Sequence, residues 1–205
     1  MSTIAPAQPM TVPEALARVP SSLYRMTLKQ YETMIAAGSF TKRDRVQLIN
    51  GYLVTRMTEL PPHGATSEMI RLAIEKFFAI DAWHFRNEKS LRIHGYTSMP
   101  LPDLALVRGT PRAYAHRYPE PSDAALVVEV AASSLDEDRA MAPIYGAGGI
   151  PVYWIANLID GQVEVHSNPG PTGYATHEVL APGHVLSVVL DGVEVGEIAV
   201  GDILP

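Results

Sequence analysis

Two carboxylates stand in unusual places in this sequence. Glu129 lies inside the apolar run AALVVEVAA, and Asp103 follows Pro102 at the start of a second apolar stretch. A carboxylate in a buried strand is costly unless it is paired, hydrogen-bonded or bound to a metal ion. If the two strands are neighbours, both acids meet at one edge of a sheet, where oxygen ligands suit Mg²⁺ (or Mn²⁺). Such an ion polarises a phosphoryl oxygen and activates water, so the pair predicts a metal-assisted hydrolytic site.

Each acid alone also fits a structural role. Asp103 could be a strand-start aspartate after a proline, and Glu129 an ion-paired glutamate. The metal site therefore depends on the surrounding elements bringing the two together.

The first half of the chain contains two helical patterns and a hairpin. Apolar residues recur at helical spacing over 26–37 and 63–80, with a chain break expected at Pro61-Pro62. Between the helices, the pair Asn50-Gly51 separates two apolar runs over 45–57 and predicts a tight β-hairpin.

The second half alternates between strands and one helix. Strands are expected at 83–94, 104–107, 124–130 and 151–157, with a loop over 108–122. A helix from Ser133 or Ser134 to about Ala147 separates the last two strands, and short antiparallel strands follow Gly161. The order predicts an α/β (α+β) fold, with a mixed central sheet, flanking helices and extra antiparallel hairpins.

Bulk composition limits the classes of protein that fit. The chain has 205 residues, no cysteine and 47% hydrophobic residues, which is typical of a globular protein without disulfides. The sequence shows neither a membrane-spanning run nor a signal peptide, so we expect a cytoplasmic protein. We expect an N-terminal arm over 1–25 and a single domain over 26–205.

Charge is distributed unevenly along the chain. The net charge is −6, and all 16 Lys and Arg residues lie at or before Arg139. The segment 140–205 holds seven acids and no base. A surface that binds phosphate must therefore come from the first two-thirds of the chain.

Several motifs, in order, resemble one family. The sequence is similar to the Uma-two family of restriction-endonuclease-like proteins, a large bacterial group in the PD-(D/E)XK nuclease superfamily. The motifs that carry the resemblance are RVQLINGYLV, Pro62-His63, PDLALVRG at 102–109, LVVEVAASS at 126–134, Tyr145, Gly149-Ile150-Pro151 and Tyr153-Trp154-Ile155. The resemblance runs from about Met26 to Val165. It implies a restriction-endonuclease-like core and a metal-dependent DNA phosphodiesterase with Asp103 and Glu129 as ligands.

The sequence departs from the family pattern at catalytic positions. Gln47 stands where a glutamate is usual and Met141 where a lysine is usual, and Ala131 leaves no lysine two residues after Glu129. Losing a group that stabilises developing charge typically costs on the order of 10² to 10³ in rate. Arg139 is a candidate replacement, although it lies about 200° around the helix from Met141.

Two further residues are candidates for substrate contacts. The family pattern suggests that His63 contacts phosphate or orients a ligand, although capping of a helix end is the plainer role. Tyr145 could face the site, although a core tyrosine is the commoner case. The remaining six histidines show no spacing typical of a metal site; they are His84, His94, His116, His166, His177 and His184.

The sequence thus predicts a metal-dependent DNA endonuclease that is weakened or inactive. Two alternatives stay open: a non-catalytic nucleic-acid-binding or dimeric scaffold protein, and a metal-dependent hydrolase of a smaller substrate. We expect a homodimer, because such nucleases often cut both strands as dimers. The apolar segments GHVLSVVL and VEVGEIAV suit a dimer interface, although core packing explains them more simply.

Overall fold

A computed structural model describes residues 23–41, 43–56, 60–79 and 81–205. The helices are α2 (Leu28–Ala36), α3 (Pro61–Glu75) and α4 (Leu135–Gly148). The strands are β1 (Val46–Ile49), β2 (Tyr52–Thr55), β3 (Trp83–Asn87), β4 (Leu104–Arg108), β5 (Ala124–Ala131), β6 (Val152–Asn157), β7 (Gln162–Gly170), β8 (Gly173–Leu180), β9 (Val185–Leu190) and β10 (Val193–Ala199). Within these ranges, no helix is long and apolar enough to cross a membrane. Most of the predicted arm over 1–25 lies outside the described residues.

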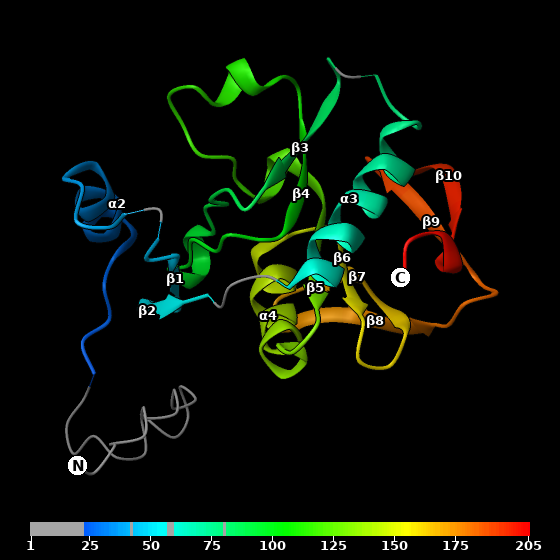
Figure 1. Ribbon diagram of the computed structural model, residues 1–205. Coiled ribbons are helices and arrows are strands. Elements are labelled where there is room, and N and C mark those ends of the chain that lie inside the picture. Colours follow the sequence, from blue (N-terminus) through cyan, green and yellow to red (C-terminus); the bar gives the residue numbers. More distant parts are fainter. Residues whose placement is uncertain (1–22, 42, 57–59, 80) are drawn as a thin grey trace, which may run out of the picture.

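A six-stranded mixed sheet forms the centre of the molecule, in the order β3-β4-β5-β6-β7-β8 (Figure 1). β5 and β6 run parallel, and the other neighbours in this sheet run antiparallel. Parallel neighbours need a long crossover, which α4 provides between β5 and β6. All eight residues of β5 are buried, as its continuous apolar run predicts for a central strand.

The two faces of the sheet are covered by different elements. From Leu126 onward, the even-numbered residues of β5, such as Val128 and Val130, pack in one core cluster with Ile70 of α3 and Leu186 of β9. Odd-numbered residues such as Val127 pack in a second cluster with Tyr145 of α4. This alternation follows from the two-residue period of a strand. Glu129 therefore points to the α4 face.

The hairpin β1–β2 forms as predicted. Its turn residues Asn50 and Gly51 both have positive φ, at 49° and 82°. This left-handed conformation is what makes Asn-Gly the preferred turn pair. The hairpin is a separate two-stranded sheet.

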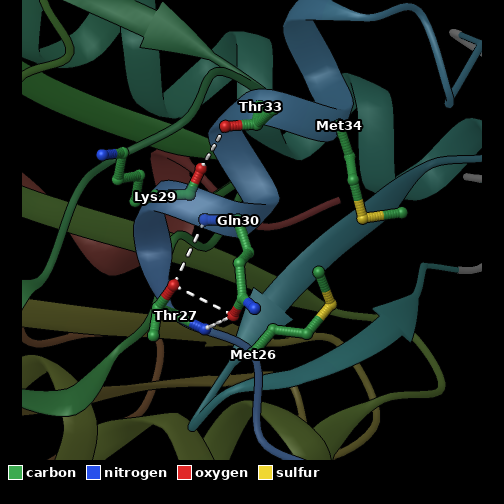
Figure 2. A pocket seen from close by; sticks show the side chains of 6 residues that line it. All are labelled: Met26, Thr27, Lys29, Gln30, Thr33 and Met34. Carbon is green, nitrogen blue, oxygen red and sulfur yellow. Dashed lines mark hydrogen bonds between the residues drawn. The ribbon is translucent and has the colours of Figure 1, made fainter.

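Helix α2 is capped at its start, where the Thr27 hydroxyl accepts from the Gln30 backbone N–H and the Gln30 side chain accepts from the Thr27 N–H. A cavity of about 520 Å³ runs along this helix (Figure 2). It is lined by Met26, Thr27, Lys29, Gln30, Thr33 and Met34. None of these is a predicted site residue.

Three predicted boundaries were wrong. The strand expected over 83–94 ends at Asn87, because Glu88 takes a positive φ of 48° and turns the chain. The expected break at Pro61-Pro62 is instead the first turn of α3, where a missing N–H costs nothing. The same helix ends at Glu75, before residue 80.

The C-terminal hairpin β9–β10 packs on the core. Leu186, Val188, Leu190 and Ile198 are buried in the cluster that contains Ile70 of α3. Core packing thus accounts for most of the apolar pattern that also suited a dimer interface.

Candidate active site

Asp103 and Glu129 meet on neighbouring strands. β4 and β5 are antiparallel with Leu104 opposite Val128, which places Asp103 beside Glu129. The Asp103 N–H donates to Glu129 Oε2 at 3.1 Å, and the Val130 N–H donates to Asp103 Oδ2 at 2.7 Å. Both residues are buried, at 3% and 5% exposed. The structure thus brings together the two acids that the sequence singled out.

Arg56, just after β2, supplies the positive charge between them. Its Nη2 contacts Asp103 Oδ1 and lies 3.4 Å from Glu129 Oε2, and its Nη1 donates to the Leu101 carbonyl. One cationic nitrogen touches both carboxylates, so two acidic oxygens converge on one point. Arg56 was not among the site residues predicted from the sequence. It could have been sought on the ground that two buried acids require a cation close to them.

His63 and Tyr145 each hold one of the acids. His63 Nε2, on α3, lies 2.9 Å from Asp103 Oδ2. The Tyr145 hydroxyl, on α4, donates to Glu129 Oε1 at 2.9 Å. Helices from both faces of the sheet therefore fix the carboxylate pair.

The two acids differ in electrostatic state. Burial and the Asp103 charge hold the pKa of Glu129 well above its ordinary value. Burial acts in the same direction on Asp103, but His63 and Arg56 outweigh it and lower the pKa of Asp103. Burial and the Glu129 charge raise the pKa of the Tyr145 phenol. Asp103 is thus the ionised member of the pair, and Glu129 is the member that binds a proton more readily.

Gln47 supports the site indirectly. Its Oε1 accepts from the Leu101 N–H at 3.0 Å, while Arg56 binds the Leu101 carbonyl. These contacts fix the backbone two residues before Asp103.

Arg139 is engaged elsewhere. Its Nε and Nη2 donate to Glu164 at 3.0 and 2.6 Å. Met141 packs partly buried against the core on the α4 face, one helical turn before Tyr145. The position of the usual lysine therefore holds an apolar side chain on the face that carries Tyr145.

A third acid, Asp138 on α4, is buried near the pair. The Ser134 hydroxyl donates to Asp138 Oδ2 at 2.6 Å. Burial, with a contribution from the Asp103 charge, raises the pKa of Asp138 to about 6. The sequence analysis did not select it, because an acid in the first turn of a helix is ordinarily explained by the helix dipole.

The site borders a small cavity of about 200 Å³ beside Asp103. The cavity is lined by Gly64, Ser67, Glu68, Asn87, Glu88 and Asp103. A ligand that enters it therefore meets Asp103, whereas Glu129 is not part of the lining.

A comparison with solved structures supports the fold. The chain is similar to a crystal structure described as "a putative nuclease belonging to DUF820" from Anabaena variabilis, with a TM-score of 0.67 and 13% sequence identity. The likeness covers 87% of this chain and 97% of that one. At this identity the likeness shows a shared fold, and it confirms the predicted fold class.

The family comparison covers most of the chain. No curated protein matches it. Residues 28–200 match the model of the family described as "Uma2: Putative restriction endonuclease". This match confirms the predicted resemblance: the chain belongs to the Uma2 family.

Proposed function

We propose that this protein is a Mg²⁺- or Mn²⁺-dependent DNA endonuclease whose activity is weakened by Gln47 and Met141. Membership of the Uma2 family supports the nuclease class. The observation that carries the metal site is the contact of one Arg56 nitrogen with both Asp103 and Glu129. Two carboxylate oxygens that converge on one cation offer a divalent ion the ligands it prefers.

The donor set fits such an ion, and Asp103 and Glu129 would hold it. A bound ion would polarise the phosphoryl oxygen and lower the pKa of a bound water. Arg56 would have to share or give up its contacts with these oxygens when such an ion binds.

The surrounding residues have positioning roles in this proposal. Tyr145 fixes the Glu129 oxygen that faces away from Arg56, and His63 fixes the second oxygen of Asp103. His63 also lies on the substrate side, since α3 residues line the cavity beside Asp103. With Arg139 held by Glu164, no cationic side chain stands at the usual lysine position to stabilise developing charge.

A non-catalytic role is the second candidate, and the position of Arg56 favours it. A guanidinium that contacts both acids, and pairs with the ionised Asp103, gives a stable site without metal. In that case the protein binds nucleic acid or acts as a scaffold. A hydrolase of a smaller substrate is the remaining alternative, favoured by the acidic C-terminal third.

The organisation that we propose with this function is a single domain over 26–205, working as a homodimer in the cytoplasm. Two helices and the β9–β10 hairpin pack on the two faces of the central sheet, which supports one folding unit. Dimerisation would let two sites act on the two strands of a duplex.

The test is plasmid cleavage with Mg²⁺ or Mn²⁺. We expect slow or undetectable cleavage by the natural protein. The double variant Gln47→Glu/Met141→Lys should cleave at least 10²-fold faster, the order of magnitude typical of one restored electrostatic group. A glutamate at position 47 can still accept the Leu101 N–H.

The control is Asp103→Ala added to the double variant, which should abolish the restored cleavage. Robust cleavage by the natural protein that Asp103→Ala abolishes would overturn the weakened-site proposal. No cleavage by a folded double variant would favour the non-catalytic role.

A further inference from the structure

A second cluster of ligand-type side chains lies on the same face of the sheet. Glu164 and His166 on β7 are two residues apart, and His166 is paired with His177 on β8. Both relations place the side chains on one face. One candidate ligand atom from each residue lies within 4.8 Å of the others.

One ring nitrogen of His166 is buried without a hydrogen-bond partner among the described residues. The residue is 9% exposed, and its Nε2 is buried without a hydrogen bond from any described residue. A buried ring nitrogen without a partner costs free energy, so such atoms normally have one. His177 Nε2 lies 3.5 Å from Glu164 Oε2, which places the second imidazole at the same carboxylate.

We propose that Glu164, His166 and His177 form a binding site for Zn²⁺ or a similar transition-metal ion. Two imidazoles and one carboxylate are a common ligand set for zinc. Imidazole selects such ions over Mg²⁺, which prefers oxygen ligands. The site therefore takes a different class of ion from the Asp103–Glu129 pair.

Binding requires one side chain to turn. The His166 and His177 rings are stacked with centroids 4.3 Å apart and planes 6° apart. Parallel rings cannot both direct a lone pair at one ion, so one ring must rotate. His177 can do this because its side chain is 48% exposed, whereas His166 is held against the Tyr153 ring.

Two neighbours orient the carboxylate. Arg139 donates twice to Glu164, and Asn157 Nδ2 donates to its Oε1 at 3.1 Å. Oε1 accepts from both Arg139 and Asn157, whereas Oε2 accepts from Arg139 Nε and also faces His177, so a metal can use the remaining lone pair of Oε2. The positive charge of Arg139 lowers the affinity, and we expect binding in the micromolar range.

The site is separate from the candidate active site. Glu129 on β5 pairs with Ile155 on β6, which pairs with Glu164 on β7. Two strand spacings correspond to roughly 10 Å. An ion at the cluster would join the edge strand β8 to β7.

The experiment is a calorimetric titration of the metal-free, full-length protein with Zn²⁺ in excess Mg²⁺. We expect one Zn²⁺ per chain and a higher melting temperature. His166→Gln and His177→Gln should each weaken binding at least tenfold. The exposed His116 is the matched control, and His116→Gln should leave the affinity unchanged.

Three results would overturn the proposal. These are no Zn²⁺ binding by the natural protein, binding that His177→Gln leaves intact, and binding that Asp103→Asn abolishes. Because His177 is half exposed, its substitution gives an answer even if His166→Gln does not fold. Zinc binding is measured independently of cleavage. The zinc proposal can therefore fail while the proposed nuclease function stands, and the reverse is also true.

Discussion

Arg56 is the residue on which the electrostatics of the candidate site depend. It contacts both carboxylates of a pair that is almost completely buried. The charges of Glu129 and Asp103 outweigh the effect of burial and raise the pKa of Arg56 above its ordinary value. The guanidinium is therefore charged at neutral pH, as arginine ordinarily is.

Arg56→Gln should destabilise the metal-free protein by about 3 to 5 kcal/mol, because it leaves buried charge without a partner. Mn²⁺ should recover much of this loss if the two acids bind metal. Urea unfolding with and without Mn²⁺ measures both effects. The control is Arg108→Gln, which removes an exposed ion pair with Asp191 and should cost about 0 to 1 kcal/mol. Equal losses in the two variants would contradict the role of Arg56.

Asp138 makes stability depend on pH. Its pKa is about 6 in the folded protein and 3.8 in the unfolded chain, so the folded state retains the proton between these values. The stabilisation is complete below about pH 3.8 and is lost as the pH rises through 6. Two pKa units correspond to about 3 kcal/mol.

Asp138→Asn stays neutral and can still accept from Ser134. The variant should therefore match the natural protein near pH 4 and exceed its stability by about 2 to 3 kcal/mol at pH 7. Urea unfolding across this range in EDTA measures the difference. Asp136→Asn, an exposed change in the same helical turn, is the control for removing an acid from this helix. A constant difference for Asp138→Asn would refute the prediction.

At the scale of elements, α4 supplies the side chains that contact the buried acids on one face of the central sheet. Tyr145 reaches Glu129, and Arg139 reaches Glu164. The helix lies close to the turn between β7 and β8, since a Cβ on Gly146 would stand 2.5 Å from the Gly173 carbonyl carbon. Only glycine at position 146 allows this approach.

Gly146→Ala should destabilise the fold by about 1 to 3 kcal/mol, because the clash is with backbone that cannot rotate away. This outweighs the gain in helix propensity of at most about 1 kcal/mol. Gly201→Ala, which points into open space, should be nearly neutral. Thermal unfolding of the two variants makes the comparison, and a neutral Gly146→Ala would show that α4 can shift freely.

Helices, strands and turns were predictable from the sequence where a single pattern of apolar or turn-forming residues dominates a segment. The buried run of β5 and the Asn50-Gly51 turn follow from local patterns, whereas the meeting of Asp103 with Glu129 was expected from the family resemblance and on condition that their strands are neighbours. The contact of Arg56 with Asp103 spans 47 residues, and no local spacing encodes it. The grouping of His166 and His177 with Glu164 could not be read from their spacing in the sequence, because the strand register decides which residues meet.

At the scale of the whole molecule, charge limits how DNA can bind. The part of the chain that forms β6 to β10 carries no lysine or arginine. If a duplex binds, its phosphates would therefore meet the part of the chain before β6, which includes α3 and β3. Lys89 is exposed there, next to the residues that line the cavity beside Asp103.

If the substrate is DNA, Lys89→Glu should weaken duplex binding and reduce the slope of log affinity against log salt by about 1. Lys29→Glu on α2 makes the same change in net charge away from the predicted site and should have little effect. Fluorescence anisotropy at several salt concentrations measures both slopes. Identical slopes for the two variants would mean that net charge alone governs binding.

The position of Arg56 also bears on how this site persists over evolutionary time. The guanidinium makes Asp103 part of what keeps the fold stable, since losing this ionised acid leaves the charge of Arg56 without its closest acidic partner in the interior. Selection for a folded chain then favours retention of Asp103 even where cleavage is lost. The presence of Asp103 alone therefore does not identify a working nuclease.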